Sequence, residues 1–349
     1  MNVSDSLPSL GSLQAVNLSD WQTMAALLRK LGRTGWDVSE VSFGAWQLGG
    51  QWGPVDDTES IRTLMDSYES GINFVDTAQM YGSGHSESIV GKSLREWGRG
   101  GIRVATKAQP VRWPEVSNSD PKYADLYPSE YLKQQVEQSL RRLKVERIDL
   151  FQLHCWAPDG LVNTDWLNVL HKFQSQGKID AIGVSIRDYK PEDGVELAKS
   201  GLVDTIQVIY NIFEQGPELE LFPAAAESNT GVIARVALDS GSLSGSWKAE
   251  TYEQWPDDSV LKQMFRGGRF LDTMERIQAL KGLSSPYFER LAEVAVRFVL
   301  DRPEVSTVIL GMSNSSRLQE NLSYSDGVRL PLELRSLLAG HEWRRNYYT

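Results

Sequence analysis

The sequence has little of several residue types, and each shortage excludes a class of protein. Its 349 residues include one cysteine, Cys155, so no disulfide forms within the chain and a cysteine-based metal cluster is excluded. The four histidines form no metal-ligand motif, and no HExxH sequence is present. No apolar run is long enough to cross a bilayer as a helix. We therefore predict no metal centre and no membrane span.

Basic residues are also scarce relative to acidic ones. Lys and Arg total 36 against 46 Asp and Glu, which gives a formal net charge of −10. Such a field repels nucleic acid and anionic membranes, so we expect neither as a partner. A phosphate-bearing ligand would need local basic side chains or backbone N–H groups. The N-terminal 20 residues lack the pattern of a signal peptide, and we expect a cytoplasmic protein.

Short runs rich in Val and Ile alternate with longer amphipathic segments along most of the chain. The short runs lack clean polar–apolar alternation, which is typical of strands buried on both faces. They are VSFGAW (41–46), INFVD (72–76), IRVATK (102–107), IDLFQLH (148–154), AIGVS (181–185), TIQVIY (205–210), GVIARV (231–236) and TVILG (307–311). Apolar residues at helical spacing predict helices over 57–70, 86–98, 129–144, 164–176, 190–200, 217–229, 285–301 and 315–324.

Eight strand–helix units in this order predict an α/β protein with a closed (β/α)8 barrel, the TIM-barrel architecture, rather than an open doubly wound sheet. A GRTG turn within residues 27–39 predicts a β-hairpin, which we expect to cap the bottom of the barrel. We assign residues 1–24 to an N-terminal extension and 25–349 to one barrel domain. The stretch 237–284 is interpreted as an insertion after the seventh strand.

Polar residues end several of the predicted strands, where the chemistry of such barrels is located. A tyrosine hydroxyl with an ordinary pKa near 10 is a poor acid until a cation stabilises its phenolate. Lys107 is suited to supply that cation to Tyr81, and Asp76 would keep the lysine charged. His154 could donate a hydrogen bond to a substrate carbonyl. Each residue alone is more often structural, but four at neighbouring strand ends predict an acid–base site for carbonyl reduction.

These motifs resemble the aldo-keto reductase family over roughly residues 27–324. The strongest match is GINFVDTAQMYGSGHSESIVGKSL (71–94), where Asp76 and Tyr81 precede a glycine-rich turn and a helix. The resemblance continues through VATK (104–107), RIDLFQLH (147–154), IGVS (182–185), IQVIYN (206–211), GVIARVALDSGSLSG (231–245) and GMSNSSRLQEN (311–321). It implies a reductase or dehydrogenase that transfers hydride between NADP(H) and an aldehyde, ketone or sugar carbonyl. No GxGxxG lies between a strand and a helix, as expected for a cofactor site without a Rossmann fold.

The resemblance also implies roles for individual residues. Asp76, Tyr81, Lys107 and His154 correspond to the catalytic tetrad, with Tyr81 as the general acid in reduction. Ser185 and Gln207 would bind the nicotinamide amide and Tyr210 would stack on its ring. Segment 235–245 would cover the pyrophosphate, and segment 311–321 would hold the adenosine. The implied cofactor contacts are Gly44, Trp46, Asp76, Ser185, Gln207, Tyr210, Arg235, Val236, Leu238, Ser240, Gly241, Leu243, Gly245, Gly311, Ser313, Asn314, Arg317, Glu320 and Asn321.

The adenosine segment departs from the pattern of many relatives. Asn314 stands where those relatives carry arginine, and Arg317 stands where they carry glutamine. A guanidinium is a good partner for a 2′-phosphate, so Arg317 is our sequence-based candidate for that contact. NADP(H) is therefore the expected cofactor, with NAD(H) as the other possibility.

Tryptophan is abundant, with 11 residues, and four lie after predicted strand ends. Aromatic walls suit sugars and other flat or apolar carbonyl compounds, although some of these rings are expected only to pack. The substrate contacts that we predict are Trp46, Trp52, Tyr81, Trp113, His154 and Trp156. We interpret His85 and Cys155 as structural residues. The sequence does not identify the substrate, the reaction direction or the oligomeric state.

Two other functions remain open at this point. The first is a nicotinamide-binding regulatory subunit with little catalysis, because the family includes channel β-subunits. The second is an unrelated barrel hydrolase that uses two carboxylates. Asp149 begins its predicted strand and so would lie at the opposite end of the barrel from Asp76, which disfavours the hydrolase.

Overall fold

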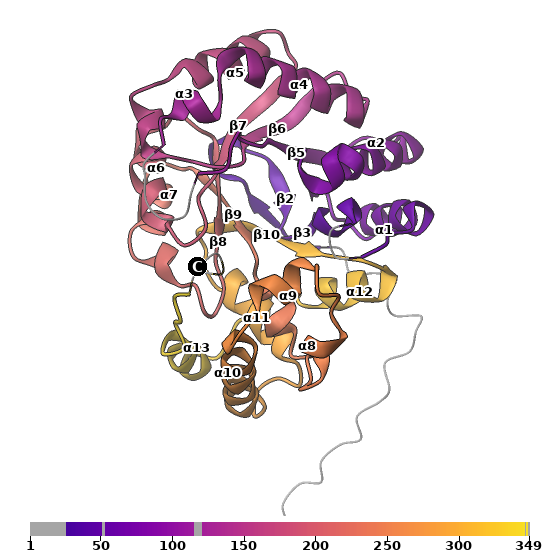
Figure 1. Cartoon of the computed structure of the whole chain (residues 1–349), viewed down its shortest axis with the longest axis vertical. Coiled ribbons are helices and arrows are strands. Elements are labelled where there is room, and N and C mark those ends of the chain that lie inside the picture. Colours follow the sequence, from indigo (N-terminus) through magenta and orange to yellow (C-terminus); the bar gives the residue numbers. More distant parts are fainter. Residues whose placement is uncertain (1–25, 51–52, 115–120, 346, 348–349) are drawn as a thin grey trace, which may run out of the picture.

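The computed structural model describes residues 26–50, 53–114, 121–345 and 347. Within them, eight parallel strands close into a barrel in the order β10-β3-β4-β5-β6-β7-β8-β9, with helices around it (Figure 1). The barrel strands are β3 (Val41–Gly44), β4 (Phe74–Asp76), β5 (Arg103–Ala108), β6 (Ile148–Leu153), β7 (Ile179–Ser185), β8 (Thr205–Ile209), β9 (Gly231–Arg235) and β10 (Val305–Gly311). The predicted (β/α)8 barrel is confirmed, and each strand lies within a predicted run or extends one by a few residues.

Helices follow the strands in the predicted alternation. Those of the barrel are α1 (Asp57–Glu69), α2 (His85–Trp97), α4 (Ser129–Leu143), α5 (Asp165–Ser175), α6 (Val195–Ser200), α7 (Leu221–Glu227), α11 (Leu291–Leu300) and α12 (Ser315–Ser323). Additional helices are α3 (Tyr123–Leu126), α8 (Thr251–Gln254), α9 (Val260–Met264), α10 (Arg269–Ser284) and α13 (Leu332–Ala339). The insertion after the seventh barrel strand therefore consists largely of α8 to α10.

Three predicted helices begin several residues later than their patterns indicated: α6 at Val195 instead of 190, α7 at Leu221 instead of 217, and α11 at Leu291 instead of 285. We expected a single helix over 285–301, but α10 ends at Ser284 and α11 begins at Leu291. Pro286 lies in the break, and proline has no N–H to donate to the preceding turn. The connection that results, 285–290, carries Arg290, whose contacts are described below.

A small antiparallel hairpin precedes the barrel. Strands β1 (Leu28–Lys30) and β2 (Asp37–Ser39) pair antiparallel, with Leu28 opposite Ser39. Leu31, next to β1, is fully buried in the apolar cluster that fills the barrel interior beside Phe74, Leu150 and Ile233. A Cβ atom added at Gly231 would lie 2.8 Å from Leu31 Cδ1, so glycine at the start of β9 leaves room for this plug.

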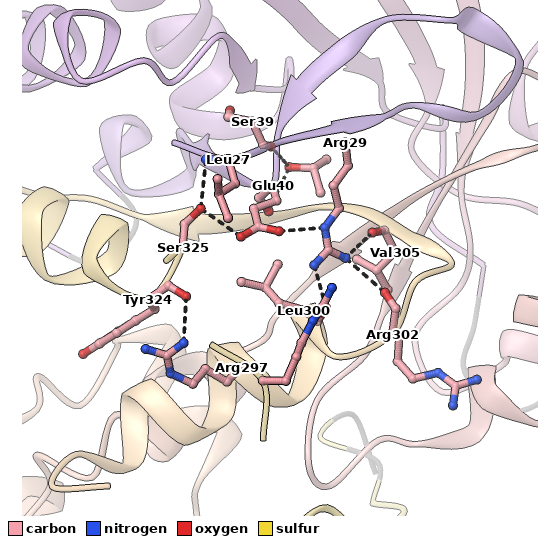
Figure 2. Close-up of polar contacts among 12 residues, drawn as sticks. Leu27, Arg29, Ser39, Glu40, Arg297, Leu300, Arg302, Val305, Tyr324 and Ser325 are labelled. Atoms are coloured by element: carbon pink, nitrogen blue, oxygen red, sulfur yellow. Dashed lines mark hydrogen bonds and ion pairs between the residues drawn. The ribbon is translucent and has the colours of Figure 1, made fainter. Parts of the chain in front are cut away.

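Arg29 fastens the hairpin to the bottom of the barrel (Figure 2). Its Nη1 donates to the carbonyls of Arg302 and Val305 at 3.1 and 3.0 Å, and its Nη2 donates to the carbonyl of Leu300 at 2.6 Å. Its Nε donates to Glu40 at 2.7 Å. The Leu300 carbonyl ends α11, and a cation is favourable at the C-terminal end of a helix. The hairpin therefore caps the barrel bottom as predicted, while residues 1–24 lie outside the described residues.

Candidate active site

Four polar side chains come together at the C-terminal ends of neighbouring strands. Asp76 ends β4, Lys107 lies near the end of β5, and His154 directly follows β6. Tyr81 begins the short 3-10 helix η4 (Tyr81–Gly84), which connects β4 to α2. The strand ends lie at one rim of the barrel because the strands are parallel and in sequential order.

The ammonium of Lys107 is fully buried, and all three of its donors have acceptors. Nζ donates to Asp76 Oδ1, to the carbonyl of Thr77 at 2.9 Å and to the hydroxyl oxygen of Tyr81 at 3.1 Å. Since an ammonium has no acceptor, the Tyr81 oxygen must accept in this contact. The hydroxyl hydrogen of Tyr81 is then left to donate to another group.

Asp76 is held on its second oxygen by two amides from the barrel interior. Gln207 Nε2 on β8 donates to Asp76 Oδ2 at 2.8 Å, and Gln152 Nε2 on β6 donates to it at 3.2 Å. A buried carboxylate is tolerated when it is paired and hydrogen-bonded, and Asp76 meets both conditions. Gln207 thus contacts the tetrad directly, a role that the sequence did not predict for it.

Burial and charge act against each other on the two titratable groups. Burial is the largest single influence on Lys107 and acts to lower its pKa, but the charges of Asp76 and Tyr81 and the hydrogen bonds to both together outweigh it and raise that pKa above its ordinary value. Burial raises the pKa of Tyr81, and the Lys107 ammonium opposes that rise without cancelling it. From the sequence we expected a net lowering for Tyr81. The structure instead gives a neutral phenol that keeps its proton throughout the physiological pH range.

His154 is the member of the group that has a polar atom without a hydrogen-bond partner among the described residues. Its Nδ1 atom is buried and has no hydrogen-bond partner among the described residues. Burial and the positive charges of Lys107 and Arg235 hold the pKa of His154 well below its usual range, so the imidazole is neutral. A buried polar atom is normally hydrogen-bonded, so an open ring nitrogen here indicates a site that a ligand completes.

Two tryptophans frame the tetrad. The Trp46 ring centroid lies 4.8 Å from that of Tyr81, and the Trp113 centroid lies 5.5 Å from that of His154. Trp156 lies elsewhere: it is fully buried beside Tyr123 and donates from Nε1 to the Asp193 carbonyl at 2.9 Å. Because it packs under the helix layer, it does not line the mouth. Trp52 is outside the described residues.

Tyr210 also faces away from the tetrad. Its ring packs between α7 and α11, with centroids 4.9 Å from Phe222 and 5.5 Å from Phe298. Side chains alternate across a strand, so an inward Gln207 places the residue three positions later on the outer face. Arg235 at the end of β9 is nearer the chemistry, since its charge influences the pKa of both Tyr81 and His154.

The predicted cofactor loop after β9 has an unusual backbone. Val236, Asp239 and Ser240 have φ values of 59°, 47° and 55°, and Gly241 and Gly245 are also in the left-handed region. For a β-branched residue such as Val236 this conformation is strained, and strain of this kind is concentrated at functional sites. Leu243 is buried beneath the loop, whereas Leu238 is partly exposed.

The predicted adenosine segment is arranged around the start of α12. Asn314 caps this helix, because its Oδ1 accepts from the Arg317 amide at 3.0 Å. Arg317 Nη1 donates to Glu320 at 3.0 Å, and Asn321 donates to the Gly311 carbonyl at 3.2 Å. The remaining predicted contacts lie at strand ends or exposed positions nearby, namely Gly44, Ser185 and Ser313.

The sequence analysis missed the C-terminal segment. Arg345 has a side chain only 9% exposed and forms an ion pair with Asp239 of the cofactor loop, while its guanidinium lies 4.7 Å from the ring centre of Phe213. The Tyr347 hydroxyl donates to the same carboxylate at 3.4 Å. The run EWRRNYYT, rich in aromatics and arginine, was the available signal, because a loosely held tail seldom carries such residues.

Two features are absent from the part of the chain that the structure describes. It contains no cluster of His, Cys, Asp and Glu arranged to hold a metal ion. It also contains no helix with the length and apolar character needed to cross a membrane.

Comparison with known proteins now identifies the family. The aldo/keto reductase family model matches residues 40–333, so the chain belongs to this family of oxidoreductases. An aldo-keto reductase from Bacillus subtilis (YhdN) is 32% identical over 290 residues, covering 82% of this chain and 85% of the relative. An NADH-specific methylglyoxal reductase from Escherichia coli is 28% identical over 305 residues, covering 84% and 91%. The solved structure of a glycerol dehydrogenase from Gluconobacter oxydans has a TM-score of 0.72 at 29% identity, covering 90% and 94%.

Membership has direct consequences for ligand chemistry. Members of this family use nicotinamide cofactors and act on small-molecule carbonyl compounds. The residues present fit such a cofactor, since the mouth holds an open His154 Nδ1 and an open, buried Trp46 Nε1 beside the tetrad.

Proposed function

We propose that this protein is an NADP(H)-dependent oxidoreductase that interconverts a small carbonyl compound, such as an aldehyde, ketone or sugar carbonyl, and its alcohol. The observation that carries the proposal is the Tyr81 hydroxyl, which accepts from the buried Lys107 ammonium at 3.1 Å beside an open histidine. Asp76, Tyr81, Lys107 and His154 are the proposed catalytic residues.

When bound, the nicotinamide would supply or accept the hydride, which no side chain provides. The chain's own residues handle the proton and the orientation. In reduction, Tyr81 donates its hydroxyl proton to the carbonyl oxygen as the carbon is reduced, and the Lys107 ammonium stabilises the developing phenolate. Oxidation of an alcohol runs through the same groups in reverse.

His154 and the tryptophans would orient the substrate. A neutral imidazole with one N–H is suited to donate to the carbonyl oxygen without competing as a proton source. Trp46 and Trp113 flank this position and would exclude water from the reacting atoms. Ser185, Gln207 and the loop 235–245 remain the proposed contacts to the nicotinamide and pyrophosphate.

The test is a binding and turnover experiment with the full chain. Titration with NADPH and NADH, followed by a panel of aldehydes, ketones and sugars, should give saturable binding and substrate-dependent oxidation of NADPH. Binding without turnover on any carbonyl or alcohol would favour the regulatory-subunit alternative. Absence of binding to both nucleotides would contradict the proposal.

A further inference from the structure

A polar pocket lies between the cofactor loop and the connection from α10 to α11. Its volume is about 330 Å³. The loop contributes Ser244, Gly245 and Ser246 to the wall, and the end of α10 contributes Lys281 and two further serines. Glu320 of α12 closes the wall on the adenosine side. The pocket is therefore bounded by the two segments predicted to bind the cofactor, 235–245 and 311–321, and by the end of α10, for which no cofactor contact was predicted.

The Lys281 ammonium makes no ion pair or hydrogen bond with any of the residues described. Its side chain lies over the loop, because a Cβ atom added at Gly245 would approach Lys281 Cε to 3.0 Å. Because this amine lies close to the predicted cofactor loop and has no partner among the described residues, it is available to bind an anionic ligand.

Arg290 reaches the pocket from the break that Pro286 imposes. Its Nη1 lies 2.9 Å from Glu320 Oε1, and Arg317 Nη1 lies 3.0 Å from the other oxygen of the same carboxylate. Two guanidinium groups therefore share one carboxylate, which leaves a net positive charge at this rim.

The charges around this pocket bear on the choice between NAD and NADP, which carry a hydroxyl and a phosphate, respectively, at the 2′ position of the adenosine ribose. A bare carboxylate beside the adenosine ribose suits the 2′-hydroxyl of NAD and repels a 2′-phosphate. Glu320 is instead neutralised from both sides, and Lys281 adds a further cation. Glu289 is the other carboxylate of the lining, but it is exposed to solvent and therefore screened. Asn314, at the position where many relatives carry arginine, is occupied as a helix cap.

We infer that Lys281 and Arg290 bind the 2′-phosphate of NADP(H) and thereby determine the preference for NADP(H) over NAD(H). This inference rests on the proposed function. It reassigns the main contact from Arg317 to Lys281 of the insertion and Arg290 of the connection 285–290, with Arg317 acting through Glu320.

The test compares two fragments of the cofactor, one with the 2′-phosphate and one without it. Calorimetric titration of the full chain with adenosine 2′,5′-bisphosphate and with 5′-AMP separates that group from the rest of the nucleotide. Lys281→Met and Arg290→Met should each lower affinity for the bisphosphate about tenfold, as expected for one charge-assisted contact, with 5′-AMP affected less than about twofold. NADPH and NADH should follow the same pattern.

Matched controls are Lys248→Met and Arg266→Met, two exposed positions in the same insertion and outside the pocket lining. Both should leave affinity for either fragment unchanged. Equal losses for 5′-AMP and the bisphosphate, or a loss in Arg317→Met alone, would overturn the inference while leaving the proposed function intact. Failure of the unmodified chain to bind NADPH or NADH would instead remove the proposed function itself.

Discussion

The two ends of the barrel each bury an ion pair whose cation finds all its acceptors within the chain, but the polar atoms around the two pairs differ. At the bottom, Arg29 and Glu40 have side chains 15% and 6% exposed, and the guanidinium also donates to three backbone carbonyls. At the mouth, Lys107 and Asp76 are more deeply buried, at 0% and 1%. Around them, His154 Nδ1, Trp46 Nε1 and Gln152 Oε1 are buried and open among the described residues.

This difference separates a stabilising site from a binding site. An ion pair whose donors all find acceptors within the chain recovers the cost of desolvation, whereas open buried atoms lower stability until a ligand arrives. Proteins accept such a cost mainly where function requires it. The comparison therefore predicts that changes at the mouth affect catalysis and changes at the bottom affect unfolding, with little overlap.

The largest effect is expected for Tyr81→Phe, which removes the proposed proton donor. Because general acid catalysis contributes roughly 10² to 10⁴-fold, kcat for carbonyl reduction should fall about 10³-fold. NADPH binding should persist, and the free energy of unfolding should change by about 1 kcal/mol or less. Steady-state kinetics and fluorescence titration measure these quantities.

Tyr68→Phe is the matched control for this change. The Tyr68 hydroxyl is buried and lies 2.8 Å from the Ser93 hydroxyl, away from the tetrad. Its loss should cost about 1 kcal/mol of stability and leave kcat unchanged. A Tyr81→Phe enzyme that retains most of its activity would show that another group donates the proton.

At the other end of the barrel, Arg29→Met should act on stability alone. Removing one partner of a buried pair leaves Glu40 without its counter-charge and the Val305 carbonyl without its Arg29 donor, at a cost of about 3 kcal/mol. Lys30→Met is the control, because Lys30 and Asp37 form a pair with side chains 65% and 56% exposed, worth less than about 1 kcal/mol. Denaturant unfolding gives both values. A loss of kcat in folded Arg29→Met would contradict the separation of the two ends.

Much of this arrangement could be predicted from the sequence, because the signals are local. Val- and Ile-rich runs mark strands buried on both faces, and a closed barrel of parallel strands brings their ends to one rim. That reasoning placed Asp76, Lys107 and His154 together without any contact information. The break between α10 and α11 was not predicted, although Pro286, which cannot continue a helix, was the available signal.

Other features depend on tertiary packing and could not be predicted in the same way. The contact of Arg290 with Glu320 joins positions 30 residues apart across two elements. The burial of Arg345 depends on how the C-terminal segment returns over the cofactor loop. For Tyr210, the resemblance suggested a stacking role, although side-chain alternation from Gln207 already pointed to the outer face.

A smaller effect is expected for Trp113→Ala at the rim of the mouth. Trp113 is 46% exposed and its ring lies against His154, so its loss should remove one wall of the substrate pocket without touching the proton donor. KM should rise about fivefold and kcat should change little, in line with about 1 kcal/mol for an aromatic contact. Trp97→Ala is the control, because Trp97 ends α2 and packs on Tyr68. Unchanged KM in Trp113→Ala would remove this residue from the substrate site.

The smallest effect concerns pH. The charges of the titratable groups at the mouth, and with them the rate of carbonyl reduction, should change little over a wide pH range. The pKa of His154 lies well below its usual range and that of Tyr81 lies above 10, so neither changes charge near neutrality. We expect kcat/KM for reduction to be flat between about pH 6 and pH 9.

The stability of the fold should depend on pH in a definite direction. In acid the unfolded chain binds a proton at His154 that the folded chain does not, so this residue lowers stability as pH falls through about 6.5. His154→Gln should therefore lose less stability between pH 8 and pH 5 than the unmodified protein. A fall in kcat/KM as pH rises through about 6.5, removed by this substitution, would instead mean that the imidazole works as a cation, and the mouth would then resemble the bottom in holding its charge.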